Sequence, residues 1–282
     1  GLIMELKTNR KQAITLTVGN FKGGVGKTTN SILIAYTLAQ KGIKTLVIDL
    51  DPQANATKTL TLTKLNQDEE GILTFEKTLM RGIADNKIDD LPIKIIDNLF
   101  LMPSNIDFEE FAKFLYQNTD NQTDEDFYFS KLLDPIKESF DIIIIDVPPM
   151  SKEITRNAVT SSDYVLISLQ TQEHSLTGAE NYIEELNKLN EKYDLNLTLV
   201  GLLPVLLKNT GTVDEYIIDN AKEIFGESNI FSTIVPQMER IKRFDINGIT
   251  NHDRHDLKVL QKYNEVTDEL ITRLNFYENE VN

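Results

Sequence analysis

The chain has 282 residues, of which 40% are hydrophobic and 26% are charged, as in an ordinary globular protein that can bury a full apolar core. It contains no cysteine, which excludes a disulfide scaffold, a cysteine nucleophile and cysteine-ligated zinc or iron–sulfur sites. With 29 Lys+Arg against 44 Asp+Glu, the net charge is -15. A nucleic acid or an anionic lipid would therefore have to meet a local positive patch.

Short β-branched runs alternate with helical patterns along the chain. Strands are predicted at residues 13–18, 45–48, 98–102, 142–145, 164–169, 197–203 and 230–235. Helices are predicted at residues 27–40, 107–116, 173–193, 213–225 and 256–274. Such alternation indicates right-handed βαβ units. The predicted fold class is α/β, with a single doubly wound, mostly parallel sheet and helices on both faces.

The chain shows no internal repeat and no linker rich in Pro, Gly or Ser. We therefore expect a single domain over residues 1–282, with a short N-terminal extension at residues 1–12. The longest apolar stretch, residues 197–207, is too short for a membrane span of about 20 residues, and the amino end lacks the apolar core of a signal peptide. A cytoplasmic protein is expected. The acidic stretch 118–126 is predicted to be a solvated loop, with a partner-docking loop as the alternative.

A glycine-rich segment joins the first predicted strand to the first predicted helix. Residues 21–29 read FKGGVGKTT, which keeps the second half of the phosphate-binding loop GxxxxGK[ST] and has Phe21 at its first glycine position. Glycines let backbone N–H groups approach phosphate at a helix N-terminus. In this pattern Lys27 pairs with the β- and γ-phosphates and the Thr28 hydroxyl ligates Mg²⁺. Alternatively, the glycine-rich segment is a turn that binds no phosphate and only allows the strand and the helix to pack.

Carboxylates end two further predicted strands. Residues 46–53 read LVIDLDPQ, and residues 141–149 read DIIIIDVPP. Ligands of open α/β sheets bind at the carboxyl ends of the strands. We therefore predict that Asp146 belongs to the outer sphere of a magnesium site and that Asp51 orients the attacking water, so that Thr28, Asp51 and Asp146 form the candidate metal site. Each carboxylate taken alone could instead cap a helix.

These motifs reveal a family resemblance. KGGVGKTT, DLDPQANAT at residues 49–57 and DVPP at residues 146–149 closely resemble the deviant Walker A, A′ and B motifs of ParA-type partition ATPases, within the ParA/MinD group. The likeness continues through residues 154–170 and through GLLPVLLKNT and IVPQMERIKRFDINGIT, so it spans nearly the whole chain. It implies a fold of the P-loop NTPase type and a Mg²⁺-dependent ATPase with ATP and Mg²⁺ as cofactors.

The resemblance also implies the residues of an ATP site. The phosphate contacts fall on Lys22, Gly23, Gly24, Val25, Gly26, Lys27, Thr28 and Thr29. In the family the early lysine, here Lys22, reaches the partner's phosphates across an ATP-bound dimer, so the catalytic candidates are Lys22, Lys27 and Asp51. The adenine contacts fall on Pro236, Gln237 and Met238, although many relatives carry arginine where this chain has Gln237.

DNA segregation is the function that the resemblance implies. The ATP-bound homodimer would bind duplex DNA without sequence preference, associate with the nucleoid, and hydrolyse ATP when a ParB-type centromere-binding protein stimulates it. No helix-turn-helix domain fits before the first predicted strand, so operator binding is not expected. A locally positive segment at residues 236–262 supplies the candidate DNA contacts, with a solvated mixed face as the alternative. These candidates are Arg240, Lys242, Arg243 and Lys258.

The alternative function is a MinD-like, membrane-associated positioning ATPase. Such a protein should carry a basic amphipathic helix. Residues 265–282 contain Arg273 as their only Lys or Arg, together with five acidic residues, and anionic lipid would repel them. No membrane partner is therefore expected. A cluster-bearing reductase would need the missing cysteines, and an ATP-dependent ligase would share only the phosphate loop.

Two short motifs are interpreted as false leads. Residues 86–89 read NKID, which matches a guanine-reading motif but follows no apolar strand. Residues 252–256 include His252, Asp253, His255 and Asp256, which could in principle hold a metal. Two histidines three residues apart without a further ligand nearby favour a polar loop over a metal site.

Overall fold

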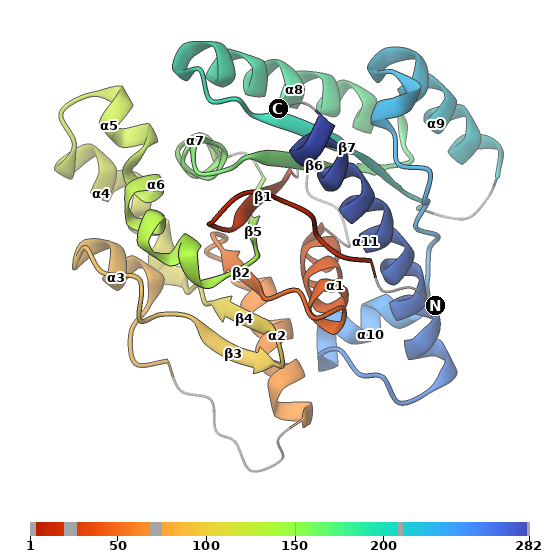
Figure 1. Cartoon of the computed structure of the whole chain (residues 1–282), viewed down its shortest axis with the longest axis horizontal. Helices are drawn as coiled ribbons and strands as arrows, with labels where there is room; N and C mark the ends of the chain where they lie inside the picture. Colours follow the sequence, from red (N-terminus) through yellow and green to blue (C-terminus); the bar gives the residue numbers. More distant parts are fainter. Residues whose placement is uncertain (1–3, 20–26, 68–74, 150, 208–210, 281–282) are drawn as a thin grey trace.

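Seven strands form one sheet in the computed structural model, which describes residues 4–19, 27–67, 75–149, 151–207 and 211–280. The strand order is β3-β4-β2-β5-β1-β6-β7, and the pairs are parallel except for β3 with β4. Helices cover both faces of the sheet (Figure 1). The predicted α/β class with a mostly parallel sheet is confirmed.

Six predicted strands form within one or two residues of their expected positions. They are β1 (Ile14–Gly19), β2 (Thr45–Asp49), β4 (Leu99–Met102), β5 (Ile142–Asp146), β6 (Tyr164–Gln170) and β7 (Thr198–Val205). β3 (Ile93–Ile96) was not predicted. It is a short, antiparallel edge strand in which only Ile95 is buried, so it lacks the continuous apolar run of the central strands.

The strand predicted at residues 230–235 is wrong. The segment makes only two isolated bridges to β7, Leu202 with Ile230 and Val205 with Val235. Between these bridges, the backbone N–H groups of Ser232 and Thr233 donate to the carboxylate of Glu269 at 2.9 and 2.7 Å. Because a side chain from another element takes these donors, a continuous ladder cannot form.

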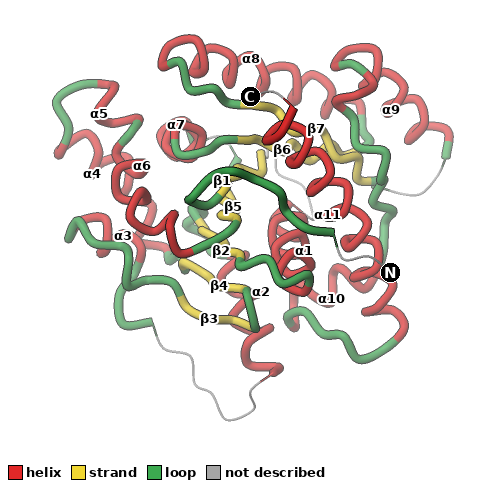
Figure 2. The backbone as a smooth tube through the Cα atoms, in the orientation of Figure 1, coloured by secondary structure: helices red, strands yellow, loops and turns green. Residues whose placement is uncertain are grey.

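One face of the sheet carries four helices. They are α1 (Lys27–Gln40), α2 (Asn55–Gln67), α10 (Glu239–Asn247) and α11 (Arg254–Glu280). Leu16 and Ile144 of the sheet share a buried apolar cluster with Leu33 of α1, Phe244 of α10 and Tyr263 of α11. The path of the backbone shows α1 beside the central strands, with α10 and α11 next to it (Figure 2).

The other face carries the remaining helices. They are α3 (Leu79–Ala84), η1 (Ile106–Glu110), α4 (Phe111–Asn118), α5 (Gln122–Asp126), α6 (Tyr128–Leu133), η2 (Asp134–Ser139), α7 (Lys152–Thr160), α8 (Glu173–Tyr193) and α9 (Thr212–Phe225), with the short η3 (Glu227–Asn229) after them. The helices predicted at residues 27–40 and 173–193 are confirmed. The helix predicted at residues 107–116 is divided between η1 and α4, and α11 is longer at both ends than predicted.

The solvated loop predicted at residues 118–126 is wrong in its second half. That half forms α5, and Asp126 at its end is only 1% exposed. The Asp126 carboxylate accepts hydrogen bonds from Arg156 Nε at 2.8 Å, from the Gln122 amide and from the Tyr193 hydroxyl. Two of these partners lie on α7 and α8, far along the chain, so the local acidic pattern gave no sign of this burial.

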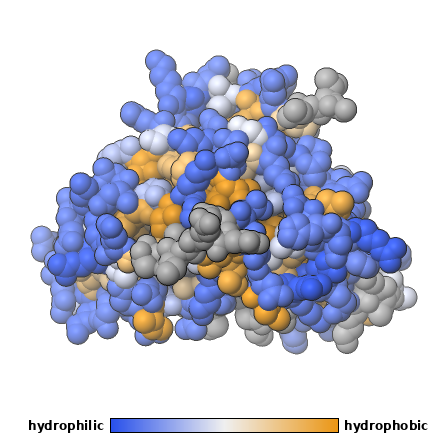
Figure 3. All heavy atoms as spheres, turned by 90° about the horizontal axis from the view of Figure 1, so that it is seen from below, coloured by the Kyte–Doolittle hydropathy of each residue, from blue (hydrophilic) through white to orange (hydrophobic). Residues whose placement is uncertain are grey.

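One face of the molecule is mostly polar. Figure 3 shows a face that is largely hydrophilic, with hydrophobic residues gathered near its middle. Tyr116 on α4 and Ile246 on α10 are two exposed apolar side chains, and they lie on helices that cover opposite faces of the sheet.

Candidate functional site

The carboxyl ends of β1, β2 and β5 lie side by side. In the sheet register Asp146 of β5 is opposite Val18 of β1 on one side and Asp49 of β2 on the other. β1 also has β6 as its other neighbour, so the strand order reverses here, and such a switch point is where open α/β sheets bind ligands. The register therefore brings the two predicted acidic motifs to the end of the glycine-rich segment.

Gly19 ends β1 and is required by packing. A Cβ built on this residue would lie 2.6 Å from the Tyr182 ring, a distance that a side chain cannot tolerate. Tyr182 comes from α8 and is partly buried, with its hydroxyl oxygen inside the protein, and burial raises the pKa of this hydroxyl. The absence of a side chain at Gly19 thus lets α8 approach the start of the glycine-rich segment.

The first turns of α1 are anchored by buried polar side chains. The Ser31 hydroxyl donates to Asp146 Oδ1 at 2.7 Å, and both residues are buried. The Asn30 amide donates to the Ser168 hydroxyl of β6 at 2.6 Å and accepts from the Tyr263 hydroxyl of α11 at 2.6 Å. These contacts fix α1 relative to two strands and to α11.

Thr29 makes a third anchor of the same kind. Its side chain is 2% exposed, and its hydroxyl donates to Asp245 Oδ1 of α10 at 2.8 Å. Burial raises the pKa of Asp245, and the hydrogen bond from Thr29 opposes that rise. The Thr29 side chain is therefore directed at α10, whereas the sequence predicted Thr29 as a phosphate contact.

Asp49 and Asp51 have different surroundings although they are two residues apart. Asp49 is fully buried, and its Oδ2 accepts from the Thr57 N–H at 2.9 Å and from the Thr57 hydroxyl at 2.7 Å. Burial raises the pKa of Asp49 to about 6, against the opposing effect of these hydrogen bonds. Asp51 is half-buried, and its Oδ1 accepts from the Gln53 N–H at 2.9 Å. Asp49 therefore holds the start of α2, while Asp51 is the more accessible carboxylate.

The predicted phosphate contacts Lys22, Gly23, Gly24, Val25 and Gly26 lie outside the described residues. For Lys27 and Thr28 the structure describes the backbone, which forms the start of α1. The hydrogen bond from Ser31 to Asp146 holds this helix start at the carboxyl end of β5. The predicted order of strand, glycine-rich segment and helix is confirmed.

The oxygen donors at this edge fit magnesium. Carboxylate and hydroxyl oxygens are hard ligands, and Mg²⁺ is commonly held by one or two carboxylates together with substrate phosphates. Within the ranges that the structure describes, no three His, Asp or Glu side chains converge on one metal position. Asp51, just after β2, and Asp146, at the end of β5, are carboxylates of the kind that Mg²⁺ prefers.

The predicted adenine and DNA segments adjoin one another. Pro236, Gln237 and Met238 follow Val235, which bridges to the end of β7, and they lead directly into α10. A cavity of about 350 Å³ is lined by Gln237 and Met238 together with Arg240 and Lys258. The structure thus brings two predicted adenine contacts close to two predicted DNA contacts.

The four predicted DNA contacts differ in their pairing. Arg240 Nη1 lies 2.6 Å from Asp253 and 2.7 Å from the buried Asp256, and this pairing lowers the pKa of Asp253 to about 2. These two carboxylates also accept backbone N–H groups at the start of α11, which explains the polar cluster at residues 252–256. Lys242, Arg243 and Lys258 are exposed. Lys242 Nζ lies 3.5 Å from Glu239 in an exposed ion pair within α10. Arg240 therefore joins α10 to α11, whereas Lys242, Arg243 and Lys258 stay exposed.

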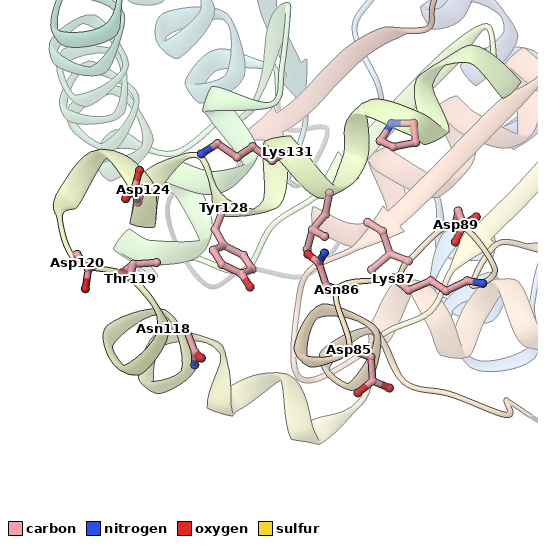
Figure 4. A pocket seen from close by; sticks show the side chains of 13 residues that line it. Asp85, Asn86, Lys87, Asp89, Asn118, Thr119, Asp120, Asp124, Tyr128 and Lys131 are labelled. Carbon is pink, nitrogen blue, oxygen red and sulfur yellow. The ribbon is translucent and has the colours of Figure 1, made fainter.

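The NKID motif occupies a polar turn, as predicted. Asn86 has φ 58, a left-handed conformation that asparagine tolerates, and the Lys87 carbonyl accepts from Lys77 Nζ at 2.9 Å. This turn lines one side of a cavity of about 860 Å³, and residues 118–120 and Tyr128 line the other (Figure 4). The cavity contains none of the residues at the carboxyl ends of β1, β2 and β5.

Helix α11 contributes its apolar face to the core. Val266, Leu270 and Leu274 are fully buried in the main apolar cluster. The Arg273 guanidinium donates to the carbonyls of Val200, Ser228 and Ile230 at 2.8 to 3.1 Å, so this cation holds the neighbouring backbone. Among the helices of the described ranges, none has the length and apolarity that crossing a bilayer requires.

Asn30, Ser31 and Asp245 were missed by the sequence analysis. The available signal was the run of polar residues at 29–31, directly before the apolar pattern ILIAY at residues 32–36. Polar side chains that point into the core at a helix start need partners. No such pattern indicated a role for Asp245, which lies in the segment 236–262 that was predicted to bind DNA because of its positive charge.

Comparison with known proteins identifies the family. The family model AAA_31, described as AAA domain, matches residues 13–199. The chain belongs to this family. The chromosome-partitioning ATPase Soj of Treponema pallidum (strain Nichols) is 26% identical over 235 residues, which are 83% of this chain and 87% of that protein. The sporulation initiation inhibitor protein Soj of Bacillus subtilis (strain 168) is 27% identical over 235 residues, which are 83% and 88% of the two chains.

The fold also matches solved structures. Cobyrinic acid a,c-diamide synthase of Mycobacterium smegmatis, solved with an ATP analog and magnesium, has a TM-score of 0.76 at 20% identity, and the match covers 95% of this AAA-domain chain and 96% of that one. At this identity the likeness concerns the fold alone. The sequence relatives confirm the resemblance to ParA-type partition ATPases, and family membership supports an ATPase.

Proposed function

We propose that the protein is a Mg²⁺-dependent ATPase that segregates DNA. Its ATP-bound homodimer binds duplex DNA without sequence preference in the nucleoid, and a ParB-type centromere-binding protein stimulates hydrolysis. The observation that carries the proposal is the meeting of α1 with Asp146 through Ser31, beside the ends of β1 and β2. The relatedness to partition ATPases supports the biological role.

In the proposed chemistry, each group at the carboxyl ends of β1, β2 and β5, here called the carboxyl edge of the sheet, has its own task. The backbone N–H groups of residues 23–29 hold the phosphates at the N-terminus of α1, and Lys27 pairs with the β- and γ-phosphates. Thr28, Asp51 and Asp146 would hold Mg²⁺, which neutralises charge that develops on the phosphates. Asp51 also orients the attacking water, and Lys22 reaches the partner's nucleotide.

The adenine contact is proposed for residues 236–238. This segment continues from the bridge between Val235 and Val205, so it lies at the carboxyl end of β7, on the edge of the sheet where the phosphates bind. Gln237 is exposed there. An amide at this place can donate to and accept from the edge of an adenine ring.

The DNA contacts are proposed for the positive segment of α10 and α11. Lys242, Arg243 and Lys258 are exposed, so phosphates can reach them, and the ion pair of Lys242 with Glu239 is itself solvent-exposed. Arg240 instead fixes the segment by pairing with Asp253 and Asp256. A dimer presents this surface twice, and each additional phosphate contact raises affinity and its salt dependence. The acidic remainder of the surface should keep binding weak and confined to this side.

A DNA mobility shift at low salt tests the proposal. The shift is measured with ATP, with ADP and without nucleotide, beside a pelleting assay with anionic liposomes. We expect a shift with ATP that disappears within a few-fold rise in salt, and no pelleting. ATP-dependent pelleting without a DNA shift would instead support the MinD-like alternative, although the apolar face of α11 is buried in the core.

A further inference from the structure

Helix α10 is tied to the start of α1 by a side-chain hydrogen bond. The Thr29 hydroxyl donates to Asp245 Oδ1 at 2.8 Å, and Thr29 is almost completely buried. Thr29 directly follows Thr28, a proposed magnesium ligand, and the N–H groups of this turn are proposed to hold phosphate. The same helix α10 carries Lys242 and Arg243 on its exposed side.

The two ends of α10 are held by different elements. At its C-terminal end, the Asn66 amide of α2 donates to the Asn247 carbonyl at 2.8 Å, and just beyond it the Thr63 hydroxyl accepts from the Ile249 N–H at 2.9 Å. At its N-terminal end, Arg240 pairs with Asp253 and Asp256 of α11. Asp245 therefore gives α10 a contact with α1 that neither end provides.

The position of this hydrogen bond connects it to the nucleotide. Phosphates bind the N–H groups at the start of α1, so the interactions of its first turn differ between the nucleotide-free and the ATP-bound protein. A change there reaches a second site only through contacts that have different free energies in the two states. The hydrogen bond of 2.8 Å from this turn to Asp245, on the helix that carries the DNA-facing cations, meets that requirement.

We propose that Asp245 is a positioning residue that couples nucleotide binding at α1 to the orientation of α10. It acts through the Thr29 hydroxyl and does not touch the nucleotide. The inference rests on the proposed function, because its consequence is that DNA affinity depends on the bound nucleotide.

Variants of Asp245 test the coupling. Asp245→Ala removes the acceptor, whereas Asp245→Asn keeps an oxygen at the same place. We expect the ratio of DNA affinities with ATP and with ADP to fall about fivefold or more in Asp245→Ala. The ratio in Asp245→Asn should stay within about twofold of the parent, because the neutral amide oxygen still accepts the hydrogen bond. Asn66→Ala is the matched control, since it removes a contact of α10 with α2 and leaves Asp245 in place.

A second measurement does not depend on DNA. Backbone amide exchange over Glu239–Asn247 is recorded with and without ATP in the parent, in Asp245→Ala and in Asn66→Ala. We expect ATP to change the exchange of α10 in the parent and in Asn66→Ala, and to leave it unchanged in Asp245→Ala. An equal response in the parent and Asp245→Ala, or no response in the parent, would overturn the coupling. A parent that binds no DNA with ATP would reject the proposed function, while the exchange data still decide the role of Asp245.

Discussion

The carboxylates at the amino ends of the strands (the amino edge of the sheet) and those at the carboxyl ends have different hydrogen-bond partners. At the amino edge, Glu278 of α11 accepts from Arg10 Nε at 2.6 Å and from the hydroxyls of Thr8 and Tyr164 at 2.5 Å. Arg10 also pairs with Asp163 at 3.1 Å. At the carboxyl edge, Asp49 accepts from the hydroxyl and the N–H of Thr57, and Asp146 accepts from the Ser31 hydroxyl.

The different partners indicate that the carboxylates at the amino edge stabilise the fold and that those at the carboxyl edge take part in the chemistry. An arginine supplied by the chain neutralises Glu278 permanently and ties the N-terminal segment to α11, where Asn275 also accepts from the Lys7 N–H at 2.7 Å. Hydroxyl donors at the carboxyl edge orient a carboxylate without cancelling its charge, so the charge can act on a bound cation. We therefore expect substitutions at the carboxyl edge to change activity most, and those at the amino edge to change stability.

The largest effect is expected for Lys27→Ala. Loss of the charge that pairs with the β- and γ-phosphates should lower ATP turnover roughly 100-fold or more. Phosphate release at saturating ATP measures it, with Lys113→Ala on the exposed side of α4 as the control. Undiminished turnover in Lys27→Ala would contradict the assignment of the carboxyl edge to ATP hydrolysis.

Substitutions of Asp49 and Asp51, two neighbouring carboxylates at the carboxyl edge, should affect stability and activity respectively. Asp51→Ala should slow hydrolysis roughly 100-fold, because the attacking water loses its orienting group, and should accumulate an ATP-bound dimer. Asp49→Ala should instead lower the unfolding free energy by about 2–3 kcal/mol, because the two buried Thr57 donors lose their acceptor. Light scattering with ATP and urea unfolding distinguish the two outcomes.

Lys22→Ala completes this test, since it should bind ATP and remain monomeric. If Lys22→Ala and Asp51→Ala both behaved like the parent in light scattering, the enzyme would be an ordinary monomeric ATPase.

A smaller effect is expected for the joint replacement of Lys242 and Arg243 by Glu. DNA affinity with ATP should fall about tenfold for every sequence, and the salt slope should decrease by about two. Arg240→Ala is the contrasting variant, because its guanidinium already pairs with Asp253 and Asp256. That variant should lower the melting temperature. Equal DNA affinity of the double variant and the parent at the same salt would move the DNA contacts elsewhere.

The smallest effect is expected for Glu278→Gln at the amino edge. Burial raises the pKa of Glu278, but hydrogen bonds from Arg10, Thr8 and Tyr164 outweigh it, so the folded pKa lies below the ordinary glutamate value. Because the folded pKa is lowered, the ionised Glu278 stabilises the protein fully above the ordinary glutamate pKa. This stabilisation is lost as the pH falls through the folded pKa. The unfolding free energy of the parent should therefore exceed that of Glu278→Gln by about 1 kcal/mol near pH 7, and this difference should shrink as the pH falls below the ordinary glutamate pKa.

Urea unfolding over this pH range measures the difference between the two proteins. A difference that stays constant with pH would mean that the carboxylate charge of Glu278 is not what stabilises the amino edge.

The sequence predicted most of the sheet and the place of the site for a local reason. The strands β1, β2 and β5 are continuous apolar runs, and the glycine-rich segment directly follows one of them. The predictions for residues 230–235 and 118–126 were wrong because side chains far along the chain contact these segments. In segment 230–235 two backbone N–H groups donate to Glu269, 36 or 37 residues away, and the buried Asp126 accepts a hydrogen bond from Tyr193, 67 residues away.

The sequence by itself determined the strand and helix alternation, the glycine-rich segment before α1, and the identity of the acidic groups that end β2 and β5. Only the tertiary structure decided that Asp49 is buried while Asp51 stays accessible, that Arg240 pairs internally, and that Thr29 donates to Asp245 across 216 residues of chain. Backbone elements follow from the periodicity of neighbouring residues. Burial and pairing of a side chain depend on groups that folding brings from other elements, and no local pattern records those groups.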